Sequence, residues 1–204
     1  MTEPSAPVAG VMLAGGRASR MGGRDKAFAT VGGEAIAVRT IRLFQSLFPQ
    51  VIVVTQRSER FVDLGVEVVA DRYPDCGPLG GIHAGLLASR YPSIFVVGCD
   101  MPGLQAEPIR LLLARIGSAD AIIPRWEHDI EPLHAVYTVR ALPVIEAALR
   151  RAEQSIRDIL PHLQVDYVPD ATLRAVRGGP ESMTNVNTPE ELAAIGGRFG
   201  EGDE

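Results

Sequence analysis

Short apolar segments alternate with helical patterns along most of the chain, and this alternation limits the folds that the chain can adopt. Apolar runs of strand length lie at 8–13, 51–54, 66–70, 94–97, 121–123 and 133–137. Apolar residues at helical spacing lie at 37–48, 81–90, 109–116 and 142–149. Strands that alternate with helices form a parallel sheet with helices packed on its faces. The sequence therefore predicts an α/β fold with a single doubly wound, mostly parallel sheet, in which 133–137 is a candidate antiparallel strand.

The length of 204 residues suits one domain over 1–204, with ends at 1–7 and 197–204 that we expect to be frayed. A capping box at Thr188, with proline at the next position, predicts the start of a last helix. The net charge of −5 gives no general attraction to nucleic acid or to an anionic membrane. No run approaches the roughly 18 apolar residues of a membrane-spanning helix, and the first residues lack a secretory signal. Two cysteines are too few for a disulfide framework, so we expect a cytoplasmic protein that binds neither nucleic acid nor membranes.

The first apolar run stops abruptly at two glycines and leads into a loop rich in glycine and in positive charge. Residues 15–26 contain four glycines, three arginines and Lys26. Glycines let backbone N–H groups approach a ligand closely, and clustered cations neutralise it, so the natural ligand is a polyphosphate. The loop is not a Walker loop, because Ala27 follows Lys26, and it lacks the glycine spacing of a dinucleotide fingerprint. The alternative is a purely structural glycine-rich loop.

Asp100 directly follows the apolar run at 94–97. In open parallel sheets, ligands bind outside the carboxyl ends of the strands, so Asp100 is expected beside the first loop. A lone carboxylate there would repel a triphosphate unless a cation lay between them. Mg²⁺ favours one or two carboxylates together with phosphate oxygens. Asp100 is therefore a candidate Mg²⁺ ligand; the alternative is an aspartate that caps a turn or helix.

A glycine-proline segment at 77–81 follows Asp71, which closes the third apolar run. This composition predicts a rigid loop, with a helix that starts near Gly81 and directs its N-terminus into the site. Backbone groups of such a loop could lie against the edge of a purine. The alternative is a plain turn before a helix.

Asn185 and Asn187 alternate in an extended segment, which places both amides on one side. They could donate hydrogen bonds to an acceptor molecule or to phosphates, or Asn187 could only order the turn before the last helix. The polar segment 125–129 is a candidate lining of an acceptor pocket. We interpret His134 as a satisfied core or cleft residue and Arg157 as part of a solvated helix face.

The motifs together resemble those of the nucleotidyltransferases, and most of all the molybdenum cofactor guanylyltransferases of the MobA-like family. The resemblance rests on Leu-Ala-Gly-Gly at 13–16, Arg-Met-Gly at 20–22 and Asp-Lys at 25–26, followed by the weaker motifs at 77–79 and 185–189. It extends from 13 to 192 and implies a Rossmann-like nucleotidyltransferase fold. One departure is mild: Gly23 and Arg24 both stand between the Met-Gly and Asp-Lys pairs, where many relatives have one residue.

The resemblance implies a reaction and a role for each matching residue. GTP would donate GMP to the phosphate of Mo-molybdopterin, with Mg²⁺ as the cofactor, giving pyrophosphate and the guanine dinucleotide cofactor. Contacts with proteins of the molybdenum cofactor pathway, or with enzymes that accept the cofactor, are also implied. The implied catalytic residues are Arg20, Lys26 and Asp100, and the acceptor would be bound by Asn185 and Asn187. The implied nucleotide-binding residues are Leu13, Ala14, Gly15, Gly16, Lys26, Asp71, Gly77, Pro78, Leu79 and Asp100.

The end of the second apolar run leaves the choice of base open. These guanylyltransferases commonly have asparagine there, whereas this chain has Val54-Thr55-Gln56. Gln56 could substitute, or the chain could be a cytidylyltransferase acting on the same pterin or on another phosphorylated small molecule. A further alternative is a regulatory module that binds nucleotide without catalysis, against which the presence of both Lys26 and Asp100 argues.

Overall fold

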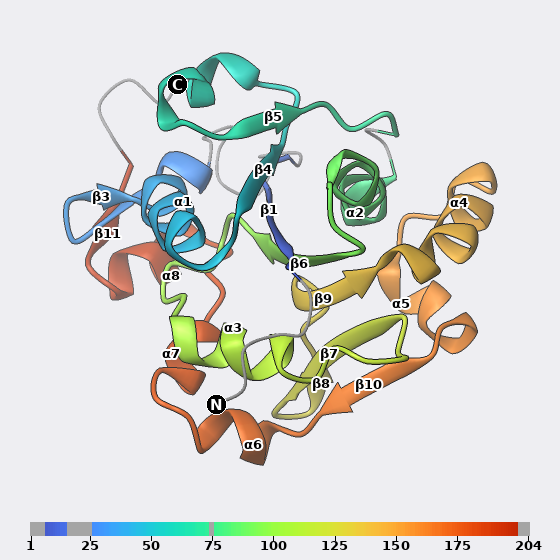
Figure 1. The fold of residues 1–204 in the computed structure, drawn as a ribbon. Coiled ribbons are helices and arrows are strands. Elements are labelled where there is room, and N and C mark those ends of the chain that lie inside the picture. The colour runs from blue at the N-terminus through green and yellow to red at the C-terminus, as the bar shows by residue number, and fades with distance from the viewer. Residues whose placement is uncertain (1–6, 16–25, 74–75, 200–204) are drawn as a thin grey trace.

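The computed structural model describes residues 7–15, 26–73 and 76–199, and its centre is one large twisted sheet (Figure 1). The strands of this sheet are β1 (Ala9–Leu13), β4 (Gln50–Val54), β5 (Glu67–Val69), β6 (Ser93–Gly98), β7 (Ala121–Trp126), β9 (His134–Thr138) and β10 (Val165–Val168). They lie in the order β10-β7-β9-β6-β1-β4-β5, and the short strand β8 (Asp129–Ile130) pairs with β7. All the predicted strands are therefore present, with ends that differ from the prediction by at most three residues.

The pairing of the strands confirms a mostly parallel sheet. β1 pairs in parallel with β4 on one side and with β6 on the other. β5 is parallel to β4, and β10 is parallel to β7. β9 is antiparallel to both of its neighbours, β6 and β7. Because β9 runs against the others, its first residues lie at the edge of the sheet where β1 and β6 end.

Helices cover both faces of the sheet (Figure 1). On one face lie α2 (Gly77–Ala88), α4 (Leu142–Arg150) and α5 (Ile156–Ile159), and on the other lie α1 (Ile36–Leu47) and α3 (Ala106–Leu113). The short helices α6 (Asp170–Arg174) and α7 (Gly179–Ser182) contact β7 and α3. Apolar residues alternate between the two faces of each strand, so Val11 and Met12 belong to separate core clusters. This arrangement confirms the doubly wound fold.

Helix α2 begins earlier than the sequence predicts. The segment 77–81 was expected to be a loop, but it forms the first turns of the helix. Gly77 has a φ of +58°, which turns the chain into the helix, and a proline follows in the first turn, where its missing N–H costs nothing. Further along, a Cβ on Gly85 would lie 2.9 Å from the Val11 side chain. Close packing on β1 therefore outweighs the low helix propensity of glycine.

A second sheet of three short strands joins the C-terminal end of the described chain to residues 30–35. It consists of β2 (Thr30–Val31), β3 (Glu34–Ala35) and β11 (Gly197–Arg198), in the order β11-β2-β3. The expectation of a frayed end at 197–204 is therefore wrong for the first two of these residues, because β2 supplies their hydrogen-bonding partner. Helix α8 (Pro189–Ala194) packs beside β11 and starts at the predicted capping box, in which Thr188 accepts from Glu191 N. The rest of both termini, 1–6 and 200–204, lies outside the described residues.

Short 3-10 helices complete the described chain. They are η2 (Lys26–Phe28), η3 (Ser58–Leu64), η4 (Val139–Ala141) and η5 (Leu160–His162). Like β2, β3, β8 and α5 to α7, these elements are too short to produce a periodic pattern in the sequence. Within the described parts of the chain, no helix has the length and apolar character needed to cross a membrane.

His134, the first residue of β9, is completely buried against the ring of Phe95. Its position in the core was expected. The expectation that its ring nitrogens are hydrogen-bonded was wrong, because neither nitrogen has a hydrogen-bond partner among the described residues. Burial disfavours the charged ring and lowers the pKa of His134 to about 3. The neutral ring is therefore part of the folded state.

We expect this histidine to weaken the fold in mild acid. In the unfolded chain His134 takes up a proton near its ordinary pKa of 6.5, whereas in the folded protein it does so only near pH 3. Between these two pH values only the unfolded state binds the proton, so the free energy of unfolding falls as the pH falls. From about pH 7 to about pH 5, this one group should remove about 2 kcal/mol. His134→Leu should lack that loss in urea denaturation, whereas the exposed control His162→Gln should keep it. An unchanged acid loss in His134→Leu would contradict this origin.

Candidate functional site

The carboxyl ends of the central strands surround a cavity of about 230 Å³, which we call the nucleotide cavity after the ligand that the sequence analysis expects here. The register places Leu13, at the end of β1, beside Val54 on one side and Gly98 on the other. The chain continues from β1 to β4 and later returns to β6 on the opposite side of β1. β4 and β6 therefore lie on opposite sides of β1, and doubly wound sheets bind ligands at such a switch point, outside the carboxyl ends of the strands. The lining residues are Leu13, Gly15, Val54, Thr55, Gln56, Asp71, Gly77, Pro78, Gly81, Gly98, Cys99, Asp100 and Leu133.

Asp100 lies at this cavity, directly after β6. Its carboxylate lines the cavity, and the residue is half-buried. Burial raises the pKa of Asp100, and the positive charge of Lys26 opposes that shift. The carboxylate is thus poorly solvated and close enough to Lys26 to feel its charge. A further cation beside Asp100 would therefore stabilise the negative charge of its carboxylate.

Lys26 is the only lysine in the chain and begins η2, immediately after the glycine-rich loop. Its Nζ donates a hydrogen bond of 3.2 Å to Asn187 Oδ1. The partner is a neutral amide, so this hydrogen bond does not itself neutralise the ammonium charge. The ammonium group therefore carries charge that an anionic ligand can use.

The segment 185–187 joins three parts of the site through three consecutive residues. Asn185 Nδ2 donates to Glu131 Oε2 at 2.8 Å, and the next backbone N–H, of Val186, donates to the carbonyl oxygen of Asp100 at 2.8 Å. Asn187 then accepts from Lys26. The two asparagines therefore do more than order a turn. They fix the positions of the Lys26 and Glu131 side chains relative to Asp100.

Asp71 lies across the cavity, after β5 and against the start of α2. Its Oδ1 accepts from Tyr73 N at 2.7 Å, and its backbone oxygen accepts from Gln56 Nε2 at 2.7 Å. Burial raises the pKa of the Asp71 carboxyl group. A Cβ on Gly80 would lie 2.6 Å from both carboxylate oxygens, so the glycine leaves room for this side chain. Asp71 and Gln56 thus form one polar wall of the cavity.

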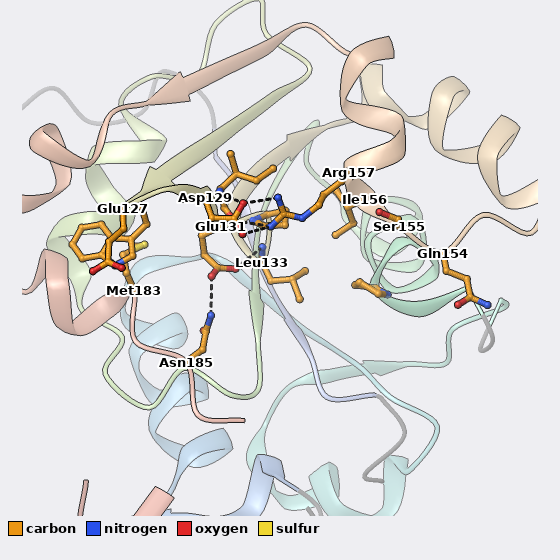
Figure 2. Close-up of a pocket in the computed structure, with 14 residues that line it drawn as sticks. Glu127, Asp129, Glu131, Leu133, Gln154, Ser155, Ile156, Arg157, Met183 and Asn185 are labelled. Atoms are coloured by element: carbon orange, nitrogen blue, oxygen red, sulfur yellow. Dashed lines mark hydrogen bonds and ion pairs between the residues drawn. The ribbon is translucent and has the colours of Figure 1, made fainter. Parts of the chain in front are cut away.

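A larger pocket of about 550 Å³ adjoins the nucleotide cavity (Figure 2), and we call it the acceptor pocket after the second substrate that the sequence analysis expects. The two share Pro78 and Leu133 as lining residues. The polar segment at 125–129 contributes Trp126, Glu127 and Asp129 to the lining of this pocket, whereas Arg125 and His128 are not among the described lining residues. The other described lining residues are Ile130, Glu131, Pro132, Gln154, Ser155, Ile156, Arg157, Met183 and Asn185.

Glu131 is a site residue to which the sequence interpretation assigned no role. It precedes the antiparallel strand β9, so it lies at the edge where the parallel strands end. Burial raises its pKa, hydrogen bonds from Asn185 and Leu133 oppose the shift, and the nearby charge of Asp100 raises it further. The sequence signal was available: an acidic residue just before a strand that is a candidate for antiparallel pairing.

Arg157 was interpreted as part of a solvated helix face, and it does lie exposed on α5, but that interpretation did not foresee its specific partner. Its guanidinium group donates to both carboxylate oxygens of Asp129, at 2.5 and 2.8 Å (Figure 2). This pair joins α5 to the β7–β8 hairpin and lines the acceptor pocket. Helix α5 has only four residues, so the sequence pattern could not orient it.

The structure brings most of the predicted site residues to one place. Leu13, Gly15, Asp71, Gly77, Pro78 and Asp100 line the nucleotide cavity, and Asn185 lines the acceptor pocket. Lys26 and Asn187 contact each other beside Asp100. Ala14 donates its backbone N–H to Val54 O, and Leu79 is completely buried in the core beneath the cavity. Gly16 and Arg20 lie outside the described residues.

Comparisons with known proteins agree with this geometry. The profile of the MobA-like NTP transferase domain matches residues 10–167. A probable molybdenum cofactor guanylyltransferase from Pelotomaculum thermopropionicum is 37% identical over 183 residues, which cover 90% of this chain and 89% of that protein. A molybdenum cofactor guanylyltransferase from Desulfosudis oleivorans is 32% identical, with 91% and 92% covered. The crystal structure of molybdopterin-guanine dinucleotide biosynthesis protein A from Archaeoglobus fulgidus superposes with a TM-score of 0.79 at 26% identity, covering 92% of this chain and 96% of that one.

Proposed function

We propose that this chain, which belongs to the MobA-like NTP transferase family, transfers GMP from GTP to the phosphate of Mo-molybdopterin and releases pyrophosphate. The product would be the molybdopterin guanine dinucleotide cofactor. The relatives named above carry the corresponding activity in their names. The observation that carries the proposal is the pair of adjoining pockets, with Asp100 in one, Asn185 in the other and segment 185–187 bonded to both sides. Two substrates bound there would meet beside Asp100.

In this proposal, the nucleotide occupies the smaller cavity. Its triphosphate would lie along 13–16, where backbone N–H groups follow the end of β1, with Arg20 and Lys26 neutralising the charge. The base would lie near Asp71 and the first turn of α2 at 77–79, whose N-terminus carries a partial positive charge. Leu79 would act there through its backbone, because its side chain belongs to the core.

The acceptor phosphate would enter from the larger pocket, past the shared residues Pro78 and Leu133. A phosphate is already an anionic nucleophile, so the reaction needs neither an activated serine or cysteine nor a strong general base. The residues would instead hold the two substrates in line and stabilise developing charge. Lys26 would leave Asn187 for the departing pyrophosphate, assisted by Arg20. Asn185 and Asn187 would hold the acceptor beside Asp100.

We also propose Mg²⁺ as the cofactor, with Asp100 as its protein ligand. Among the residues that the structure describes, no group of three or more acidic, histidine or cysteine side chains could bind a metal on its own. A single half-buried carboxylate that lines the cavity fits Mg²⁺ that takes its remaining ligands from phosphate oxygens and water. When bound, the ion would polarise the α-phosphate and neutralise charge on the leaving group.

The polar wall formed by Gln56 and Asp71 supports guanine over cytosine. Because Gln56 Nε2 is used by the Asp71 carbonyl, its Oε1 remains as an acceptor, and Tyr73 N occupies only Oδ1 of the Asp71 carboxylate. Two acceptors match the adjacent N–H donors of the guanine edge. Cytosine offers a single donor, its N4 amino group, next to acceptors at N3 and O2, so it could satisfy only one of the two wall acceptors and would place an acceptor against the other.

The test is pyrophosphate release by the purified protein with Mg²⁺ and either GTP or CTP, with and without Mo-molybdopterin. We expect acceptor-dependent release with GTP and a kcat/KM at least about tenfold lower with CTP, because an unmatched polar contact costs at least that factor. Gln56→Leu should reduce the preference. Equal turnover with CTP would favour a cytidylyltransferase, and tight GTP binding without turnover would favour a regulatory module.

A further inference from the structure

Arg157 is the one cationic side chain among the described residues that line the acceptor pocket (Figure 2). Three carboxylates, of Glu127, Asp129 and Glu131, line the same pocket. An acceptor that carries a phosphate is itself an anion. The charge of the lining therefore opposes the proposed substrate unless Arg157 contacts it.

The pair between Arg157 and Asp129 has the geometry of an oxyanion site that a carboxylate of the protein fills. The planar guanidinium group presents two parallel N–H donors, and both point at the carboxylate. A phosphate or another oxyanion fits the same two donors. The guanidinium hydrogen bond lowers the pKa of Asp129, so the carboxylate stays ionised. The donors are thus oriented before an anionic ligand arrives.

Arg157 can leave Asp129 for another anion at a small cost in free energy. The side chain of Arg157 is 52% exposed and that of Asp129 is 67% exposed, and ion pairs in contact with water contribute little to stability. Arg157 also borders a further pocket of about 440 Å³, and none of the described residues lining that pocket lines the nucleotide cavity. The guanidinium group therefore lies on a side of the acceptor pocket that is separate from the nucleotide.

We propose that Arg157 is the anion-binding residue of the acceptor pocket and that an anionic group of the acceptor replaces Asp129 as its partner. Asp129 holds the guanidinium group in position while the pocket is empty and excludes ligands that lack a matching negative charge. This inference rests on the proposed function. It adds the residue that recognises the acceptor.

Single substitutions of Arg157 and of Asp129 should change the KM for the acceptor in opposite directions. Arg157→Gln should raise the KM for Mo-molybdopterin about tenfold or more, because it removes a charge-assisted bidentate contact. Asp129→Asn keeps the shape and the hydrogen bond from Ile130 N but removes the competing charge, so it should lower that KM by about two- to fivefold. The KM for GTP should stay unchanged in both. If the pair is only a clamp between α5 and the hairpin, both variants should raise the KM for the acceptor, and that result would overturn the proposal.

Binding without turnover provides an independent readout. The chain has one tryptophan, Trp126, and it lines the acceptor pocket, so quenching of its fluorescence reports acceptor binding. The affinity measured in this way should fall in Arg157→Gln and rise in Asp129→Asn. Molybdopterin with and without molybdenum distinguishes the anion: an effect confined to the metal-containing form identifies the metal oxyanion, and an equal effect identifies a group common to both.

The Arg115–Asp166 pair is a matched control. It is also bidentate, at 2.8 and 2.8 Å, and neither residue is among the described lining of the three pockets. Arg115→Gln and Asp166→Asn should leave the affinity for the acceptor unchanged.

Absence of turnover in the unchanged protein would count against the proposed function, whereas normal turnover with no effect of Arg157→Gln would count against this inference alone.

Discussion

Replacement of Asp100 by asparagine is expected to reduce acceptor-dependent pyrophosphate release by about a thousandfold. Asp100 is the carboxylate that directly follows β6 at the nucleotide cavity, and burial already disfavours its charge. The amide has the same shape but cannot neutralise a divalent cation. Excess Mg²⁺ should therefore fail to restore turnover. Release of pyrophosphate across a Mg²⁺ titration measures the effect.

The same variant should remain folded. The bond that ties Val186 to residue 100 uses the backbone oxygen of Asp100, which the substitution leaves in place. A neutral amide also avoids the cost of burying a charge. Urea denaturation should give a free energy of unfolding no lower than that of the unchanged protein, and Asp63→Asn, at an exposed carboxylate that does not line the cavity, serves as the control. Turnover within about tenfold of the unchanged protein would refute the metal role.

Replacement of Lys26 by glutamine is expected to lower kcat/KM for GTP by about a hundredfold or more. Glutamine can still donate to Asn187, so the contact that orders this corner of the site is kept while the charge is lost. The loss should appear in turnover more than in stability, because the hydrogen bond that Lys26 makes within the described part of the chain is to the neutral amide of Asn187. Steady-state kinetics with GTP and denaturation measure the two effects.

The single lysine allows a direct check of the same role. Amine-directed labelling modifies only Lys26 and the N-terminus, so GTP with Mg²⁺ should protect Lys26 from modification. Arg110→Gln, which removes a surface cation paired with Glu107 and lining neither pocket, should leave kinetics unchanged. Full labelling of Lys26 at saturating GTP would contradict phosphate contact.

The central part of the fold could be predicted because its signals are long and strong. Runs such as 51–54 and 94–97 are buried on both faces of the sheet, so they are continuously apolar. The position of Asp100 beside the loop after β1 then follows from topology alone. The start of α2 could not be predicted, because glycines that pack a helix against β1 look the same in sequence as glycines that form a turn.

The acceptor side was harder to predict than the nucleotide side. Its walls come from short elements, β8 and α5, whose lengths of two and four residues produce no pattern. Arg157 and Asp129 lie 28 positions apart, and only the folded chain shows that they pair. Glu131 could have been found from its place before an antiparallel strand. The motif at 185–187 was recognised, but its contacts with both pockets depend on tertiary structure.

Transfer of label from GTP tests the central claim most directly. The purified protein is incubated with Mg²⁺ and Mo-molybdopterin, and with GTP that is radiolabelled at either the α- or the γ-phosphate. Nucleotidyl transfer predicts that the α-label appears in the pterin product and that the γ-label appears in pyrophosphate. Label from the γ-phosphate in the pterin product, or α-label recovered only as free nucleotide, would contradict it.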